Sequence, residues 1–350
     1  MRDIGELDRP TSETFFAGLD IGSHTTRMLV ARKNGTQLTP ARAERRVTRL
    51  AQNFQDSGTI TEEAQQRNIS AIKEFISILR QYRVGGIACG ATGVVRRAGN
   101  STAVMEAIQA ETGVQCRILS EKTEAILSAK GILSVLPQTG GDLLTFDIGG
   151  GSTEFLLAVE SGDALPNASR PIGAATLSEA YLGADPPGPG AVARAALHTR
   201  NEIMSAKEQI YQNIRSTRII GKEGPRLAGT AGTVTTLAAM HMRLERYVPY
   251  LVNGLVLTKS WISGTIESLA QMPLAERRLI AGLEPGREDI ILGGAVIASE
   301  ILTCFGRDSF IVTDAGLLEG LLIDLIERET GLGGENAGLR TLLTWRLQKR

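Results

Sequence analysis

One pattern occurs twice in this chain and limits its fold more than any other feature. Phe15–Ile21 is an apolar run that contains Asp20 near its end, and a glycine turn and a second apolar segment follow it. Leu143–Ile148 repeats this pattern, with Asp147 placed 127 residues after the first acid. Solenoid repeats span about 20–50 residues, so this period is too long for a solenoid. We therefore predict an internal duplication that gives two similar α/β domains.

Turn signals and apolar periodicity predict alternating helices and strands after each start. In the first half we expect helices that begin after Thr61 and Asn100, strands at Val84–Cys89 and Val114–Leu119, and a helix at Glu121–Leu136. In the second half we expect helices at Ala191–Asn213, Lys259–Gln271, Asp289–Phe305 and Leu317–Glu329, and strands at Arg218–Gly221 and Phe310–Val312. The domains should cover residues 1–130 and 131–350, with the option that the last helix packs back on the first domain.

The composition excludes several classes of protein. The 38 basic residues balance 38 acidic ones, so we expect no strongly basic surface for nucleic acid or anionic membranes. The first residues lack the apolar segment of a secretory signal, and no apolar run reaches the roughly 20 residues of a spanning helix. Cys89, Cys116 and Cys304 are too scattered for a disulfide framework or a thiolate metal site. These observations predict a soluble cytoplasmic protein with three buried free thiols.

The two duplicated turns have the composition of phosphate-binding loops. Gly22-Ser23 follows Asp20 closely, and a run of three glycines and a serine follows Asp147. Glycine lets the backbone approach an anion closely, and several N–H groups of such a turn can point at one phosphate. Each acid would repel phosphate unless a divalent cation lay between them, which implies Mg²⁺ or an equivalent ion. The alternative is that these turns only connect strands.

Three further segments are suited to phosphate chemistry. Gly229–Thr233 is a Gly/Thr loop that opens a helix, although a helix start rich in Thr can be only a cap. Arg96 and Arg97 lie between a strand and a helix, where a guanidinium can bind phosphate or simply face solvent. Glu121 and Glu124 begin the helix that joins the halves. Either acid can be an ordinary residue of a helix N-terminus, but Glu124 lies one turn deeper, where a carboxylate could polarise a water.

Six segments in order resemble the exopolyphosphatase / guanosine pentaphosphate phosphatase (Ppx/GppA) family of the actin/Hsp70/sugar-kinase superfamily. They read LDIGSHTTRMLV, ATGVVRRAGN, ILSEKTEAILSAKG, FDIGGGSTEF, GTAGTV and VTDAGLLEGLL. The resemblance extends from about Phe15 to about Thr330. It implies an α/β fold of two ribonuclease-H-like domains facing each other across a cleft. It also implies Mg²⁺ (or Mn²⁺) dependence and release of terminal phosphate from inorganic polyphosphate or pppGpp.

The resemblance also implies roles for individual residues. Glu124 matches the catalytic glutamate that activates water, and Arg96, not Arg97, matches the phosphate-binding arginine. Asp147 and Glu154 match the acids associated with the metal and water, and the repulsion argument adds Asp20 as a metal ligand. The candidate substrate-binding residues are Ser23, His24, Arg96, Gly149, Gly150, Gly151, Ser152, Thr153, Gly232 and Thr233.

Two motifs depart from the family pattern. The first loop usually resembles GSNS and reads Gly22-Ser23-His24-Thr25 here, and the glutamate motif SGxEEA lacks its Gly and the first of its paired acids. Glu124 itself is retained. The expected reaction is metal-assisted hydrolysis, in which Glu124 orients or deprotonates water for in-line attack on the terminal phosphorus.

His24 introduces a titratable group where the family commonly has Asn. An unperturbed histidine has a pKa near 6.5, and a bound phosphate would favour its cationic form whereas nearby Mg²⁺ would oppose it. We expect phosphate to dominate, so that substrate binding tightens as the pH falls from about 8 to about 6. The alternative is that His24 turns away and titrates without consequence.

Two other functions use the same superfamily fold. An ATP-dependent kinase or ATPase would need an adenosine pocket, to which Gly229–Thr233 could contribute. A filament or nucleotide sensor would need no catalytic residue, and Glu124 argues against it. The sequence leaves open the preference between polyphosphate and pppGpp, the choice of metal, and the oligomeric state, for which a homodimer is one option.

Overall fold

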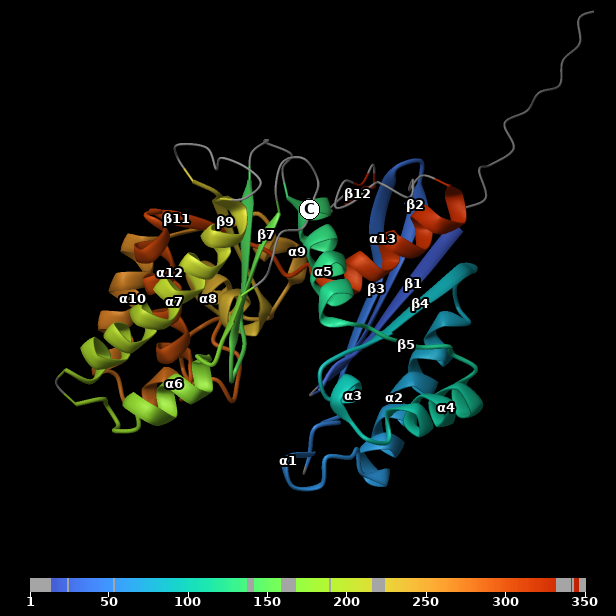
Figure 1. Cartoon of the computed structure of the whole chain (residues 1–350), viewed down its shortest axis with the longest axis horizontal. Helices are drawn as coiled ribbons and strands as arrows, with labels where there is room; N and C mark the ends of the chain where they lie inside the picture. Colours follow the sequence, from blue (N-terminus) through green and yellow to red (C-terminus); the bar gives the residue numbers. More distant parts are fainter. Residues whose placement is uncertain are drawn as a thin grey trace, which may run out of the picture. The chain divides into compact units, whose positions relative to one another are not determined.

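The structure, a computed structural model, describes residues 14–23, 25–52, 54–136, 142–158, 168–188, 190–215, 224–331, 341 and 343–345. Over these residues the chain forms two α/β units, each built on one six-stranded sheet (Figure 1). Unit 1 is discontinuous: it contains the chain up to Glu124 and again from Leu318, whereas unit 2 runs from Ala125 to Leu317. The division expected at residue 130 therefore falls inside helix α5, Glu121–Val135, whose first turn belongs to unit 1.

The sheet of unit 1 has the strand order β12-β3-β2-β1-β4-β5. Strands β1, β2 and β3 form an antiparallel meander, and β4 and β5 continue the sheet parallel to β1. The strands are β1 Thr14–Ile21, β2 Thr25–Asn34, β3 Gln37–Val47, β4 Val84–Ala91, β5 Arg117–Ile118 and β12 Thr344–Trp345. The helices are α1 Phe54–Ser57, α2 Glu62–Leu79, α3 Val94–Arg97, α4 Ser101–Thr112 and α13 Leu317–Thr330, together with the first turn of α5.

Helix α2 shows how local sequence fixes an element of this unit. The Thr61 hydroxyl accepts a hydrogen bond from the N–H of Ala64, which caps the helix as predicted, and two acids follow in the first turn. Its Ile72 shares one buried cluster with Leu19 of β1 and Ile108 of α4. Because side chains alternate along a strand, the opposite face of β1 is left for another helix.

That helix is α13, which lies on the other side of the sheet from α2 and α4 (Figure 1). Two glycines make its close approach possible. A Cβ at Gly18 of β1 would lie 3.0 Å from the carbonyl oxygen of Leu318, and one at Gly90 of β4 would lie 3.0 Å from Cδ1 of Leu321. The last long helix therefore packs on the unit formed by the start of the chain.

The sheet of unit 2 has the strand order β10-β11-β9-β6-β7-β8. The strands are β6 Leu143–Ile148, β7 Thr153–Ala158, β8 Ala168–Arg170, β9 Arg226–Thr230, β10 Val256–Thr258 and β11 Ser309–Val312. The helices are α6 Ala174–Tyr181, α7 Ala191–Arg215, α8 Ala231–Met242, α9 Pro249–Val252, α10 Lys259–Gln271, α11 Leu274–Arg277 and α12 Ile291–Phe305.

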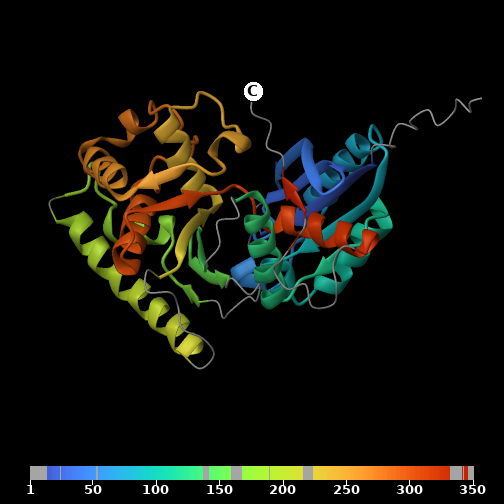
Figure 2. The same ribbon diagram turned by 90° about the horizontal axis from the view of Figure 1, so that it is seen from above.

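Alternation along β6 divides the core of unit 2 between two faces. Phe146 is buried in one cluster with side chains of α7, α8 and α12, of which α7 is the long helix in Figure 2. Leu143 is buried in a second cluster with Ala129 and Ile132 of α5. Helix α5 therefore covers the face of this sheet to which odd-numbered residues of β6 belong.

The predicted duplication is confirmed by the strand pairing. The order β3-β2-β1-β4-β5 in unit 1 matches β8-β7-β6-β9-β11 in unit 2, with the same parallel and antiparallel relations. The match extends to the glycine turns. Gly22 N–H donates to the Thr25 carbonyl at 3.0 Å, and Gly149 N–H donates to the Ser152 carbonyl at 2.9 Å.

The predictions for individual elements were confirmed only in part. Helix α4 begins after Asn100 as predicted, but the Asn100 side chain does not cap it, because its amide instead exchanges two hydrogen bonds with the backbone of Ile60. The strand expected over Val114–Leu119 is limited to Arg117–Ile118. The strand expected at Arg218–Gly221 lies outside the described residues, and the described strand of that region is β9, Arg226–Thr230.

The prediction of three free thiols was also wrong. Cys89 and Cys116 form a disulfide with a Cα–Cα distance of 4.6 Å, whereas Cys304 is free and buried. Parallel pairing of β4 with β5 places Gly90 opposite Arg117, so the preceding residues, Cys89 and Cys116, become neighbours. A sequence separation of 27 residues gives no sign of this contact. Among the described residues, no helix combines the length and the apolar character needed to span a membrane.

Candidate active site

The glycine turn of unit 1 is tied to the loop that carries the two arginines. Ser23 Oγ accepts a hydrogen bond from the N–H of Val94 at 3.0 Å. Gly93 precedes that residue with φ of 54°, and a Cβ there would lie 2.5 Å from Ser23 Oγ. Only glycine fits this position, both in conformation and in space. His24 lies outside the described residues.

The two neighbouring arginines of α3 point in different directions. Arg96 Nη1 donates to Glu124 Oε2 at 2.6 Å and to the Leu119 carbonyl at 3.1 Å. The Arg97 guanidinium instead lies over the ring of Phe54, 5.5 Å from its centroid. Arg96 is thus directed at the expected catalytic glutamate, and Arg97 is exposed on another side of the helix.

Glu124 has the electrostatic setting of a general base. Burial raises the pKa of its carboxyl above the ordinary value of 4.5, Arg96 lowers it, and the negative charges of Asp20 and Glu121 raise it further. Its side chain keeps 32% of its surface exposed, so water can reach it, whereas Glu121 is 78% exposed. A carboxylate with a raised pKa is better matched to accept a proton near neutral pH.

Asp20, expected as a metal ligand, already has a cationic partner. Its Oδ2 accepts hydrogen bonds from Arg27 Nη2 at 2.6 Å and from Arg27 Nε at 3.0 Å. The two residues are directly opposite in the β1–β2 register. Oδ1 of Asp20 is buried and has no hydrogen-bond partner within the described residues, so one oxygen is left for a ligand.

Unit 2 places a different pair at the equivalent positions. Asp147 of β6 is directly opposite Glu154 of β7, in the register that joins Asp20 to Arg27 in unit 1. Opposite residues of antiparallel strands share a face, with Cβ atoms about 4.5–5.5 Å apart, and like charges there are unfavourable. A divalent cation would relieve this repulsion. Glu154 Oε1 accepts a hydrogen bond from Ser169 Oγ at 3.1 Å, which orients the carboxylate.

The glycine loop after Asp147 turns its N–H groups outward. The carbonyls of Gly149 and Gly150 accept hydrogen bonds from the first N–H groups of α6, those of Ala174 and Ala175, both at 2.9 Å. Because a trans peptide sets C=O and N–H on opposite sides, the N–H groups of Gly150 and Gly151 point away from α6. Both glycines are exposed, so the loop offers successive donors suited to an anion.

The hydroxyl residues at the end of this loop differ in exposure. Ser152 is half-buried, whereas Thr153 is fully buried and its Oγ1 donates to the Ile172 carbonyl at 2.6 Å. The structure therefore uses the Thr153 side chain inside unit 2 and does not bring it to the exposed side of the loop.

The third predicted loop joins β9 to α8 through a strained residue. Ala231 has φ of 68°, a left-handed conformation that is unfavourable for a residue with a Cβ. The following Gly232 is covered by the guanidinium of Arg287, because a Cβ at Gly232 would lie 2.8 Å from Arg287 Cζ. Thr233 is buried, so only its backbone could serve a ligand.

Arg287 is the site residue that the sequence reasoning missed. Nε of Arg287 donates a hydrogen bond to Glu284. Nη1 of buried Arg277 donates to the carbonyl of the next residue, Glu288, at 3.2 Å. The guanidinium lies at the N-terminus of α8, where an anion is favoured. No spacing or motif connects Arg287 with Gly232, 55 residues earlier in the chain, so only the folded unit shows the contact.

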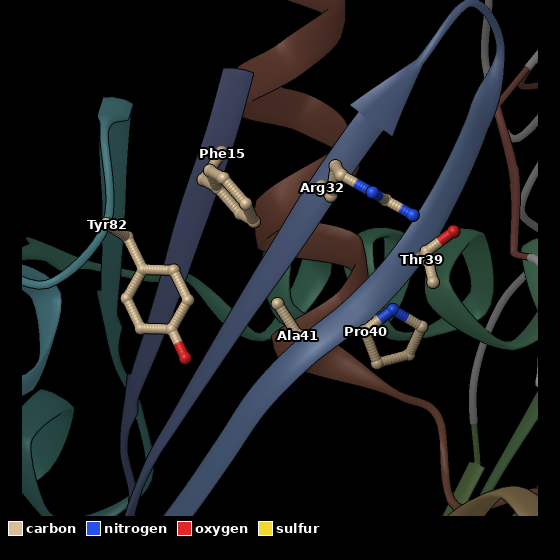
Figure 3. Close-up of a pocket in the computed structure, with 6 residues that line it drawn as sticks. All are labelled: Phe15, Arg32, Thr39, Pro40, Ala41 and Tyr82. Atoms are coloured by element: carbon tan, nitrogen blue, oxygen red, sulfur yellow. The ribbon is translucent and has the colours of Figure 1, made fainter. Parts of the chain in front are cut away.

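A pocket of about 410 Å³ lies elsewhere in unit 1 (Figure 3). Its lining residues are Phe15, Arg32, Thr39, Pro40, Ala41 and Tyr82. The rings of Phe15 and Tyr82 meet edge to face at its side, 5.3 Å between centroids. Phe15 lies at the start of β1 and Asp20 near its end, so this pocket is separate from the predicted site residues.

Comparison with known proteins shows which family and which proteins the chain resembles. The model of the Ppx/GppA phosphatase family matches residues 29–329. An Exopolyphosphatase 2 of Mycobacterium tuberculosis is 26% identical over 89% of this chain and 98% of its own length. A bifunctional 3-dehydroquinate synthase/phosphatase of Fusobacterium nucleatum is 26% identical over 92% of this chain, which spans only 48% of that protein.

A solved structure shares the fold over nearly the whole chain. The crystal structure of the Ppx/GppA family member from Aquifex aeolicus has a TM-score of 0.78 and 26% sequence identity. The match covers 91% of this chain and 99% of that one.

Proposed function

Because the chain belongs to the Ppx/GppA phosphatase family, we propose that it releases terminal orthophosphate from inorganic polyphosphate. The enzyme is a hydrolase of phosphoanhydride bonds. The name of the M. tuberculosis relative supports polyphosphate as the substrate. We propose pppGpp as a second substrate, because it also ends in a phosphoanhydride-linked phosphate.

The observation that carries this proposal is the pair formed by Arg96 and Glu124. A partly buried carboxylate with a raised pKa is held 2.6 Å from an arginine that can also bind phosphate. In the reaction, Glu124 takes the proton of the attacking water, and Arg96 binds the terminal phosphate that is attacked. Phosphoryl transfer mainly requires positioning and charge stabilisation, so no covalent nucleophile is needed.

Unit 2 carries its own donors suited to phosphate. The outward N–H groups of Gly150 and Gly151 suit one phosphate, and Arg287 with the N-terminus of α8 suits another. The position of Arg287 over Gly232 supports this role. Because Ala231 holds a strained conformation at the same loop, the site is built at a cost in stability.

Members of this family generally depend on a divalent metal ion. The residues present fit Mg²⁺ or Mn²⁺, because Mg²⁺ is usually held by one or two carboxylates together with substrate phosphates. We propose Asp147 and Glu154 as that pair. No group of three or more acidic, His or Cys side chains suited to a metal occurs among the described residues. When bound, the ion would neutralise phosphate charge.

The test is orthophosphate release measured with Mg²⁺ on polyphosphates of defined lengths, beside pppGpp and ATP. We expect orthophosphate release from the ends of polyphosphate without cleavage of internal bonds, and a rate about 10²–10⁴-fold lower in the Glu124→Gln variant. ADP formation that exceeds polyphosphate hydrolysis, or that rises with an added sugar, would instead support a kinase or ATPase. Absence of turnover on all three substrates would contradict the proposal.

A further inference from the structure

The disulfide between Cys89 and Cys116 lies at the base of the segments that carry Arg96 and Glu124. Cys89 belongs to β4, whose chain continues through Gly93 into the helix of Arg96. Cys116 directly precedes β5, whose chain continues into the first turn of α5 with Glu124. The covalent bond therefore joins β4 to the residue directly before β5, and the chain after each of these strands carries one member of the Arg96–Glu124 ion pair.

Besides the disulfide, β5 is held by a partly exposed ion pair between Arg117 and Asp324 of α13 at 3.1 Å and by its pairing in the sheet. Its pairing with β4 covers two positions, and one further hydrogen bond runs from Leu119 N–H to the Ala91 carbonyl at 2.9 Å. Arg117 and Ile118 are exposed on this edge strand. An edge strand of this length contributes little burial, so the disulfide is a large part of its attachment.

Displacement of β5 would act directly on the reacting groups. The Leu119 carbonyl, one residue beyond β5, accepts a hydrogen bond from Arg96 at 3.1 Å. Glu124 follows in the next turn and accepts another from the same arginine. Catalytic groups lose much of their effect when displaced by about 1 Å.

We propose that Cys89–Cys116 is a redox-active disulfide whose exchange with small dithiols loosens β5 and lowers the hydrolytic rate. The effect on rate rests on the function proposed above, whereas the exchange itself does not. In a reducing compartment such a disulfide would form and break reversibly and would not be a permanent structural cross-link.

The exchange is chemically complete with a dithiol as reductant. A thiolate of the reagent attacks Sγ of half-buried Cys116, and the protein disulfide breaks as Cys89 leaves and takes a proton. The second thiol of the reagent then attacks the mixed disulfide and releases Cys116 as a thiol. Two electrons and two protons pass to the protein, and the reagent becomes a cyclic disulfide. Cys89 is 3% exposed, so attack at Cys116 is the accessible route.

Thiol counting tests the exchange in the whole protein. Protein purified without reductant is denatured and alkylated, before and after native incubation with dithiothreitol. We expect one modified cysteine before incubation, Cys304, and three after it. Three modified cysteines before incubation would overturn the proposal, as would a disulfide that resists dithiothreitol until the protein is unfolded.

Stability and rate test the coupling. On reduction we expect the Tm of unit 1 to fall by about 6–12 °C and kcat to fall about threefold or more, with recovery on reoxidation. Cys116→Ser should show the reduced values with or without dithiothreitol. Cys304→Ser is the matched control, because burial raises the pKa of that thiol to about 11 and it is outside the disulfide; it should respond as the wild type does.

The remaining outcomes separate the two proposals. Unchanged kcat and Tm in reduced wild type would overturn the coupling, even if Cys116→Ser failed to fold. If thiol counts and Tm changed while no substrate was hydrolysed in either state, the exchange would be supported and the hydrolase function would be contradicted.

Discussion

Nη1 of Arg96 donates a hydrogen bond to Oε2 of Glu124 at 2.6 Å, although 28 residues separate them in the chain. A phosphate that reaches Arg96 competes with this carboxylate for the same guanidinium. Because Arg96 lowers the pKa of Glu124, sharing Arg96 with phosphate would raise that pKa and make Glu124 a stronger base in the function proposed here.

The variant Glu124→Gln should keep the fold and substrate binding but lose the base. We expect kcat to fall by about 10²–10⁴-fold, the usual contribution of general base catalysis. Steady-state phosphate release measures this. Glu121→Gln is the control at the same helix end, because Glu121 is exposed and meets Arg96 only at 3.4 Å, so it should lower kcat far less than Glu124→Gln. Retention of more than about a tenth of the wild-type rate would exclude Glu124 as the base.

Arg96→Ala should impair turnover far more than Arg97→Ala. Arg96 contacts Glu124, whereas Arg97 stacks on Phe54. We expect kcat/KM to fall by about 10²-fold or more for the first variant and by less than about threefold for the second. Equal losses, or a larger loss at position 97, would contradict the assignment.

The pH profile should show the raised pKa of Glu124. The base acts only when ionised, so kcat/KM should fall as the pH drops through a pKa above the ordinary 4.5. Arg96 lowers this pKa, so Arg96→Gln should move the acidic limb to higher pH. Profiles at fixed free Mg²⁺ measure both effects, with Arg97→Gln as the unshifted control. An acidic limb at or below 4.5 in the wild type would be inconsistent with the burial of Glu124.

The two duplicated acids should respond differently to metal. Asp147→Asn should raise the Mg²⁺ concentration for half-maximal rate about tenfold or more and weaken Mn²⁺ binding seen by electron paramagnetic resonance. Asp20→Asn should change Mn²⁺ binding less, because Arg27 already compensates Asp20. It should instead lower the free energy of unfolding by about 1–3 kcal/mol. A larger metal effect at Asp20 than at Asp147 would reverse the assignment.

The histidine of the first loop can be tested without a structural premise. If His24 meets substrate phosphate, KM should fall as the pH is lowered from about 8 to about 6 in the wild type. In His24→Asn this dependence should be lost. Superimposable KM profiles at equal metal concentration would remove His24 from the substrate site.

The fold could be predicted because its main signals are local or repeated. The two Asp-Gly turns match at one period, and the helices carry apolar residues at helical spacing. The length of strand β5 could not be predicted. Its two paired residues are exposed, so they show no apolar pattern, and they form a strand only by pairing with β4. The disulfide was missed for the same reason, since the pairing that creates it joins segments 27 residues apart.

Residues of the candidate site could be predicted only where they belong to a recognisable sequence motif. Arg96 was distinguished from Arg97 by resemblance, and the contact with Glu124 supports that choice. The different surroundings of Asp20 and Asp147 could not be read from their shared motif, because they depend on the residue across the strand pair. Arg287 and Gly232 meet only through the folding of unit 2.

The packing of α13 on Gly18 and Gly90 sets an order for synthesis of the chain. Unit 1 stops at Glu124 and resumes at Leu318, so roughly 190 residues of unit 2 leave the ribosome in between. At a synthesis rate of about 5–20 residues per second, roughly 10–40 s pass before α13 is available to pack on its face of β1 and β4. The continuous unit 2 can complete its own sheet during that time. The nascent first half therefore exposes one apolar side of its sheet during that time, so aggregation is most favoured before α13 has been synthesised.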